Sequence, residues 1–204
     1  MKISKKIAFI SAIFVLVLGI GFSIWYLVSD KSTLSHVITQ IKAPTLSERQ
    51  KQLLAQPALS SDIQIDKLIV YKSKREMQAY ANGKLVKTYP IALGLNPIGH
   101  KQFEGDKKTP EGIYYINDRN ANSAYHKNLG VSYPNQKDKA FAQSQGKSAG
   151  GDIKIHGIKN GYGKVIGEKH LLKDWTDGCI AVTDREMDEL FTAVKHNAMI
   201  DIRP

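Results

Sequence analysis

The single cysteine, Cys179, is the most reactive side chain in this 204-residue sequence. It follows Gly178 and begins a short apolar run, 179–182. A cysteine without a disulfide partner in its own chain is either a small buried hydrophobe or a residue kept for its reactivity. A glycine next to it permits a sharp turn, and such turns can point backbone amides at a developing oxyanion. The pattern leaves both interpretations open, a structural cysteine or a nucleophile at the start of a strand.

A thiol nucleophile needs a base, and His156 is the best candidate of the six histidines. It ends the apolar strand-like stretch 153–155 and precedes Gly157, so its ring can stand at the edge of a sheet. A purely structural histidine remains the alternative at this point. The other five lie in a polar N-terminal segment, in loops, in a lysine-rich segment or at a helix end: His36, His100, His126, His170 and His196.

Other catalytic chemistries find little support. One cysteine with scattered histidines gives no closed set of metal ligands, and no His-Glu-x-x-His motif occurs. The glycines of Gly161-Tyr162-Gly163 lack the strand, helix and lysine of a phosphate-binding loop. A serine nucleophile would need a Ser-x-x-Lys motif in a suitable place. We therefore expect no metal and no cofactor.

The elements that must position Cys179 and His156 are mostly strands. Asn82-Gly83 between two apolar runs is a strong hairpin signal, and 120–151 has the composition of a loop. A helix is expected after Thr183, which has capping-box spacing to Glu186. We predict one mainly β domain over 63–204. Its expected strands are 68–71, 77–81, 85–93, 112–117, 152–156, 179–182 and 198–202.

Two motifs together resemble the catalytic domain of the L,D-transpeptidase (YkuD-type) family. Ile155-His156-Gly157 is followed about twenty residues later by Gly178-Cys179-Ile180, and 108–114, 150–153 and 182–190 agree with the same family. The resemblance covers most of 63–204. It implies a β-sandwich-like fold of two mixed sheets with one or two helices, and an enzyme that acts on peptidoglycan stem peptides.

The resemblance also implies roles for particular residues. Cys179 would be the nucleophile that attacks the carbonyl between diaminopimelate and the terminal D-Ala, and His156 would be its general base. The carbonyl of Gly157 would orient the imidazole, and amides around Asp177, Gly178 and Cys179 would form the oxyanion hole. An amine acceptor would then take the acyl group from the thioester.

The sequence departs from the family pattern Ser-x-Gly-Cys-x-Arg at several positions. Thr176 replaces the serine, Asp177 stands where histidine is frequent, and Ala181 replaces the arginine. An arginine can clamp a substrate carboxylate with two hydrogen bonds, which alanine cannot do. Arg119 or a nearby lysine is a candidate to compensate, and Thr176 and Tyr133 are further candidates for substrate binding.

The Gly-Cys-Ile-Ala-Val turn resembles that of a proteobacterial branch whose members carry out different reactions. They form 3–3 cross-links, attach an envelope lipoprotein to the wall, or cut such a linkage with water. Transpeptidation is our first hypothesis. A hydrolase on the same fold (an L,D-carboxypeptidase or amidase) and a non-catalytic tether between membrane and murein are the alternatives.

The N-terminus has the pattern of a membrane anchor. Lys2, Lys5 and Lys6 precede 7–28, a run of 22 residues without a charge. Such a helix would be about 33 Å long, enough to cross a bilayer core of about 30 Å. We predict a single-pass anchor over 1–28 with a cytoplasmic N-terminus; a cleaved signal peptide is the alternative. In both cases the rest of the chain is exported, to the periplasm or cell-wall space.

The remaining N-terminal segment, 29–62, is polar and has no glycine or aromatic residue, so we predict a tether that contains a short helix within 45–56. The net charge of +10 falls to +7 without the three leading lysines. The lysines of the exported part are dispersed, and this part would lie outside the cytoplasm. Both features argue against nucleic acid as a partner.

Overall fold

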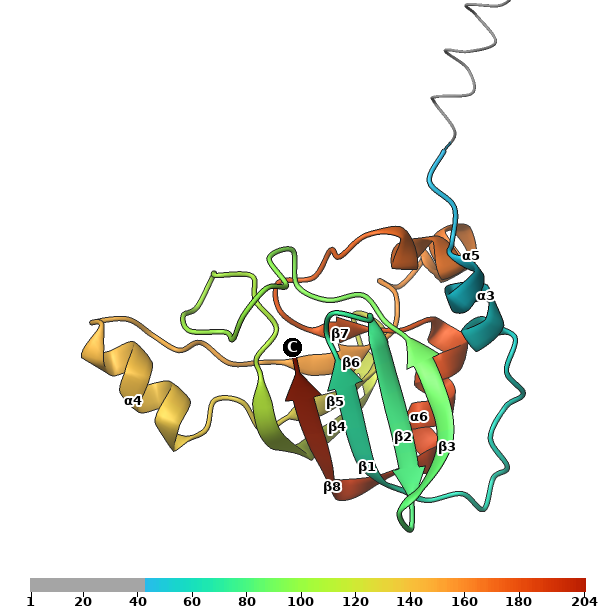
Figure 1. Cartoon of the computed structure of the whole chain (residues 1–204), viewed down its shortest axis with the longest axis horizontal. Coiled ribbons are helices and arrows are strands. Elements are labelled where there is room, and N and C mark those ends of the chain that lie inside the picture. The colour runs from blue at the N-terminus through green and yellow to red at the C-terminus, as the bar shows by residue number, and fades with distance from the viewer. Residues whose placement is uncertain (1–42) are drawn as a thin grey trace, which may run out of the picture. The chain divides into compact units, whose positions relative to one another are not determined.

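The computed structural model describes residues 43–204 (Figure 1). The predicted membrane segment 1–28 and the start of the predicted tether lie outside the described residues. Within 43–204 no helix has the length and apolar character needed to cross a bilayer. The helices are α3 (Glu48–Leu54), α4 (Gln136–Ser144), α5 (Gly163–Ile166), the 3₁₀ helix η1 (Gly167–Leu172) and α6 (Asp184–Ala193). The strands are β1 (Ile65–Tyr71), β2 (Glu76–Ala81), β3 (Lys84–Pro90), β4 (Gly112–Ser123), β5 (His126–Val131), β6 (Lys154–His156), β7 (Ile180–Ala181) and β8 (Val194–Arg203).

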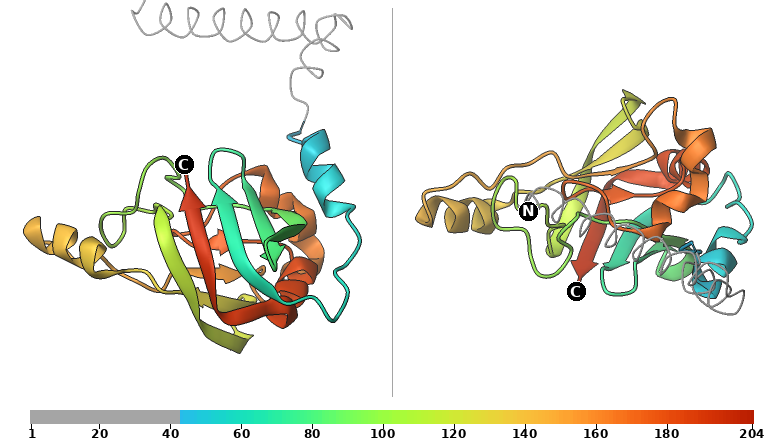
Figure 2. Two further views of the ribbon diagram at one scale, coloured as in Figure 1. Left: turned by 60° about the horizontal axis from the view of Figure 1, so that its bottom comes forward. Right: turned by 90° about the horizontal axis from the view of Figure 1, so that it is seen from above.

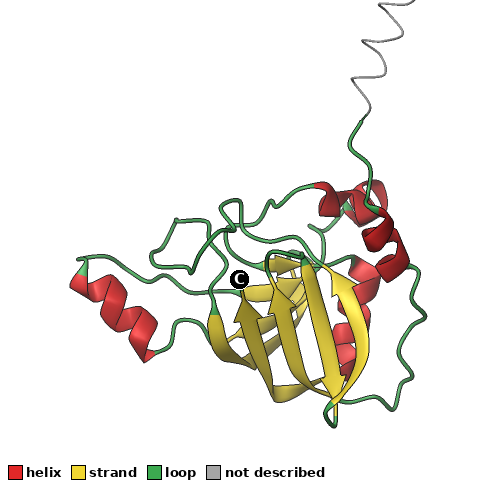
Figure 3. Ribbon diagram, in the orientation of Figure 1, coloured by secondary structure: helices red, strands yellow, loops and turns green. Residues whose placement is uncertain are grey.

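The strands form one curled sheet in the order β3-β2-β1-β8-β4-β5-β6-β7 (Figure 3). The prediction of a mainly β fold is confirmed. The two predicted mixed sheets are present as the two parts of this curled sheet, β3-β2-β1-β8-β4 and β4-β5-β6-β7, and each part contains one parallel strand pair. The long strand β4 joins the two parts. Its first part, 112–115, pairs with β8, and its second part, 116–123, pairs with β5, so the sheet continues around a bend. The described residues also contain more helices than the one or two predicted.

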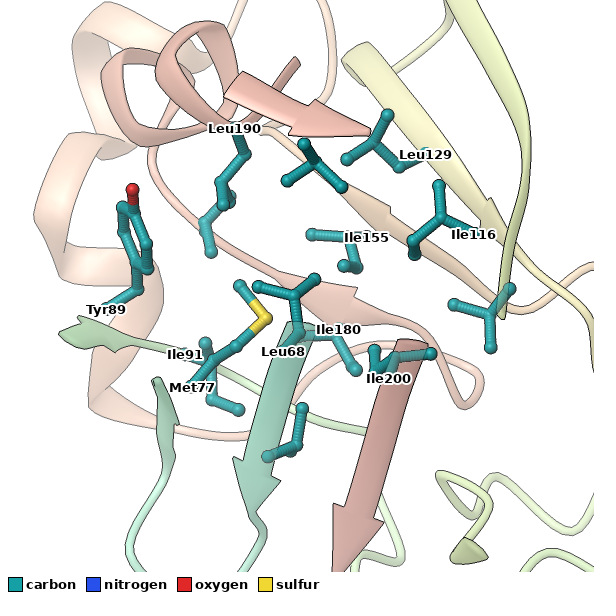
Figure 4. Packing of buried hydrophobic residues seen from close by; sticks show 14 of the residues in the cluster. Leu68, Met77, Tyr89, Ile91, Ile116, Leu129, Ile155, Ile180, Leu190 and Ile200 are labelled. Atoms are coloured by element: carbon teal, nitrogen blue, oxygen red, sulfur yellow. The ribbon is translucent and has the colours of Figure 1, made fainter. Parts of the chain in front are cut away.

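The two ends of the curled sheet meet at Ala181, the residue opposite His156 in the β6–β7 pair. Ala92, just after β3, and Ala181 of β7 exchange two backbone hydrogen bonds of 2.9 and 2.8 Å. The closure encloses an apolar interior, which α6 covers on one side (Figure 4). Each fully buried large side chain there contributes about 1.5–3 kcal/mol. Buried members include Leu68, Met77, Ile116, Leu129, Ile155, Ile180, Leu190 and Ile200.

Two local predictions are confirmed in detail. The β2–β3 hairpin turns at Asn82 and Gly83, whose φ values of 51° and 77° are both positive, as a two-residue hairpin turn of this kind requires. Thr183 and Glu186 form the predicted capping box at the start of α6. These signals are local in sequence, so composition and spacing were enough to find them.

The prediction of a loop over 120–151 is wrong. The end of β4, all of β5 and helix α4 lie in this range, and α4 projects away from the sheet (Figures 1 and 2). The second half of β4 is mostly exposed and polar, so it shows no alternation. On β5, Gly130 allows close strand packing, since a Cβ there would lie 2.7 Å from the Cβ of Asp118.

The second part of the predicted tether belongs to the domain. The compact unit begins at Thr45, well before the expected boundary at Ile63. The predicted short helix is present as α3, which Ser47 caps and which buries Leu53 and Leu54. Gln50 of α3 donates to the carbonyl of Leu171 in η1 at 3.1 Å. A few apolar contacts in a polar segment are hard to recognise before the partner surface is known.

Candidate active site

Cys179 and His156 line the same surface cleft, which has a volume of about 510 Å³. The cleft lies over strands β5 and β6 and the turn before β7. Its walls are made by residues far apart in sequence: Asn120, Asn122, Ser123, Ala124, Tyr125, Asn128, Gly151, Asp152, Ile153, Lys154, Trp175, Thr176 and Asp177. The two residues predicted to react are therefore brought together by the fold.

Strand register places these side chains. β6 and β7 are parallel, with Ile155 opposite Ile180 and His156 opposite Ala181. Side chains alternate along a strand, so the ring of His156 points to the cleft while Ile155 is fully buried in the core. Cys179 comes one residue before β7, so the same register puts it opposite Lys154, two positions from His156 and on the same face. The short pairing of two strands thus fixes the positions of both candidate catalytic groups.

The imidazole of His156 is buried and oriented. Its Nδ1 lies 2.7 Å from the carbonyl oxygen of Gly157, which makes Nδ1 the N–H donor and leaves Nε2 as the acceptor. The rings of Tyr125 and Trp175 lie against it, with centroids at 4.9 and 5.5 Å. Burial lowers the pKa of His156 below its usual value. The ring is therefore neutral at neutral pH and can accept a proton.

The thiol of Cys179 is partly buried and has one hydrogen-bond acceptor, the carbonyl oxygen of Asp152 at 3.6 Å. Burial raises the pKa of the thiol above its usual range. A neutral thiol and a neutral imidazole that line one cleft suit a mechanism in which the proton moves during the attack on substrate.

The turn that presents Cys179 is closed by the side chain of Thr176. Its Oγ1 donates to the carbonyl of Cys179 at 2.7 Å and accepts from the amide of Gly178 at 3.1 Å. Gly178 has a φ of 131°, which L-residues rarely adopt. Within 43–204, the amides of Asp177 and Cys179 have no acceptor. These two amides are thus available to an oxyanion, whereas the Gly178 amide, also expected in the hole, is already bonded.

Replacing Thr176 with valine should remove both hydrogen bonds and leave the Gly178 amide and the Cys179 carbonyl without partners. We expect a loss of about 1–3 kcal/mol in the free energy of unfolding and a lower kcat, because the turn is no longer held. Thr176→Ser keeps the hydroxyl and is the matched control. Denaturant unfolding and turnover of both variants test this; equal behaviour of the valine and serine variants would contradict it.

Two residues expected at the substrate lie elsewhere. Arg119 donates to the backbone carbonyls of Phe191 and Val194 and does not line the cleft. Tyr133 is buried, and its hydroxyl donates to the carbonyl of Ala149 at 3.0 Å. By contrast, Thr176 and Asp177 do line the cleft.

Several cleft residues were not found from the sequence, among them Tyr125, Asn128, Lys154 and Trp175. Lys154 was detectable, because it lies two positions before His156 and so shares its face of the strand. Asn128 is opposite His156 in the β5–β6 register and is buried, and within the described residues its Oδ1 has no partner. This placement depends on a long-range register that the sequence did not reveal.

His170, in the segment between His156 and Cys179, is buried behind Trp175. The indole Nε1 of Trp175 donates to its Nδ1 at 3.4 Å, and in the described structure its Nε2 has no partner. Burial, with a smaller effect of nearby His156, lowers the pKa of His170 to about 4.

His170 should make the domain sensitive to acid. Its pKa in the unfolded chain is about 6.5, so between that pH and about 4 the unfolded state binds a proton that the folded state does not. The free energy of unfolding should therefore fall, by about 2–3 kcal/mol from pH 7 to pH 4.5 through this group. His170→Gln keeps an acceptor for Trp175 but does not titrate. The free energy of unfolding of this variant should therefore fall less over the same pH range. Equal acid sensitivity of both proteins in denaturant titrations would refute this.

Among residues 43–204 there is no group of three or more His, Cys, Asp or Glu side chains that could hold a metal ion.

Comparison with known proteins identifies the family. Residues 65–202 match YkuD, the L,D-transpeptidase catalytic domain. The match covers more than half of the chain, so this chain belongs to the YkuD family, as its motifs suggested.

Two relatives indicate which members are similar. YafK of Escherichia coli (strain K12), provisionally named an L,D-transpeptidase, is 28% identical over an alignment of 157 residues that covers 74% of this chain and 52% of YafK. Pgp2 of Campylobacter jejuni, described as a helical cell shape determining protein, is 28% identical in its K307A mutant structure. That comparison has a TM-score of 0.52 and covers 70% of this chain and 48% of Pgp2. The chain thus spans about half the length of both relatives.

Proposed function

We propose that this protein is a cysteine-dependent L,D-transpeptidase that acts on peptidoglycan stem peptides. The observation that carries the proposal is the shared cleft of Cys179 and His156. The Nδ1 of His156 is bonded to Gly157, which leaves Nε2 as a base. Family membership supports the substrate class.

The proposed reaction has two acyl-transfer steps. As Sγ of Cys179 bonds to the carbonyl carbon of diaminopimelate, Nε2 of His156 takes the thiol proton, and the amides of Asp177 and Cys179 bind the oxyanion. The C–N bond then breaks, and His156 returns the proton to the leaving amine of D-Ala. An acceptor amine next attacks the thioester and gives a proton to His156, and the C–S bond breaks to restore the thiol.

The acceptor defines the biological reaction. An amine of a second stem gives a 3–3 cross-link, a lysine of an envelope lipoprotein gives protein attachment, and water gives a tripeptide. Pgp2, described as a cell shape determining protein, supports an activity that remodels the wall.

Product analysis tests the proposed function. The chain is incubated with disaccharide-tetrapeptides, and the products are separated and weighed by mass spectrometry. Cross-linked dimers that have lost one D-Ala support transpeptidation. Tripeptides as the sole product would contradict transpeptidation and indicate a hydrolase. Unchanged substrate together with retained binding to murein would indicate a non-catalytic tether.

We also propose that segment 7–28 holds the protein in the cytoplasmic membrane, with the catalytic domain in the periplasm. The support is the 22-residue uncharged run after three lysines. Fractionation of a Gram-negative host that expresses the full chain should find it in the membrane, and protease added to spheroplasts should digest it. Recovery in the soluble cytoplasmic fraction would contradict this.

A further inference from the structure

Lys154 stands next to the reactive cysteine. It precedes Ile155 on β6, so strand alternation places it on the same face as His156, and the parallel register with β7 places it beside Cys179. Among the described residues that line the cleft, it is the one lysine or arginine. The cleft therefore has a permanent positive charge close to the thiol.

Two carboxylates compensate part of this charge, Asp152 by direct contact and Asp118 on β4 from farther away. The Nζ of Lys154 lies 2.8 Å from Oδ1 of Asp152, whose side chain is 83% exposed, while that of Lys154 is 27% exposed. An ion pair with so exposed a partner contributes little, and an ammonium has two further donors. The other acidic residue of the cleft, Asp177, pairs with Lys107 at 2.9 Å. An anion that enters the cleft can therefore bind Lys154 beside Asp152 or instead of it.

Within residues 43–204, Lys107 reaches the cleft residue Asp177, but Lys107 is paired with it and does not itself line the cleft. Ala181 replaces the arginine of the family pattern, and this residue is fully buried and hydrogen-bonded to Ala92. Arg119 is bonded to the backbone carbonyls of Phe191 and Val194, away from the cleft.

We propose that Lys154 forms a carboxylate-binding site beside Cys179, and that this site holds the carboxylate of the D-amino acid that leaves. The identity of that carboxylate rests on the proposed function, but the anion site itself does not. The hydrogen bond to Asp152 raises the pKa of Lys154, which agrees with an ammonium that stays charged across the working range.

Alkylation of Cys179 tests the anion site without any substrate. Iodoacetate and iodoacetamide are close in size but differ in charge, and Cys179 is the one thiol of the full chain. Lys154→Met should lower the ratio of the iodoacetate rate to the iodoacetamide rate roughly tenfold, the effect of losing a charge-assisted hydrogen bond. Lys154→Arg should keep the ratio, and Asp152→Asn, which frees the ammonium, should raise it.

Lys127→Met is the matched control. Lys127 lies on β5, is 33% exposed and pairs with one carboxylate, Asp188, at 2.8 Å, but it does not line the cleft. Its loss should leave the ratio unchanged. If Lys154→Met slows both reagents equally, the lysine acts on the thiol and not on a carboxylate, and the proposal is overturned.

A second measurement uses tetrapeptides that end in D-Ala or in D-alaninamide. Lys154→Met should lower kcat/KM roughly tenfold for the acid and much less for the amide. Equal losses would overturn the assignment of the leaving carboxylate. If the unmodified protein cleaves neither peptide, the proposed function fails, while the alkylation ratio still decides the anion site.

Discussion

Replacing Cys179 with alanine is expected to lower turnover of tetrapeptides by a factor on the order of 10⁴ or more. Removal of a nucleophile or of its base from a catalytic pair has effects of this size, because the covalent route is lost. The side chain is partly buried at the cleft, so the free energy of unfolding should change by only about 1 kcal/mol. The measurement is product formation by the purified variant, together with the mass of any carbapenem adduct. Undiminished turnover by Cys179→Ala would exclude the proposed mechanism.

His156→Ala supplies a test of whether the two residues act as a pair. Loss of the base should lower the turnover of tetrapeptides by a factor of similar order. The turnover of the double variant should be little lower than that of either single variant. The adduct distinguishes the two roles, since a carbapenem should still label Cys179 slowly in the histidine variant. Additive losses would mean that His156 and Cys179 act independently.

The candidate catalytic pair could be predicted because its signals are local. A cysteine after a glycine and a histidine at the end of an apolar strand are visible in the sequence itself, and the resemblance joined them. The walls of the cleft could not be predicted in this way. Tyr125 and Asn128 reach it through the pairing of β4, β5 and β6, a register set by contacts between distant segments.

The continuity of the two predicted sheets through β4 could not be predicted for a related reason. A strand that changes partners halfway, as β4 does, looks the same in sequence as one that stays in a single sheet. Likewise, α3 is a short polar helix, and its two leucines can be recognised as buried only when the surface that they cover is known.

Gly94 is not a reacting residue, yet Gly94→Ala is expected to damage both stability and activity. A Cβ at this position would overlap the backbone carbonyl oxygen of Lys107 and lie 3.0 Å from the Cα of Gly178. Both neighbours are backbone, which cannot rotate away as a side chain can. The amide of Leu95, the next residue, bonds to the carbonyl of Thr176 at 2.9 Å. A shift at Gly94 would therefore be passed directly to the turn that presents Cys179.

We expect Gly94→Ala to lose about 3 kcal/mol in the free energy of unfolding, the upper end of the range typical of overpacking, because here the backbone must absorb it. In the fraction that stays folded, kcat should fall roughly a hundredfold, because a displacement near 1 Å misaligns the nucleophile. Gly151→Ala is the stability control: its φ is ordinary and a Cβ there would come no closer than 3.8 Å to another group, so unfolding should change by about 0.5 kcal/mol or less. Denaturant unfolding and the iodoacetamide rate of Cys179 measure the two effects separately. A folded Gly94→Ala with normal Cys179 reactivity would show that close backbone packing does not position the turn.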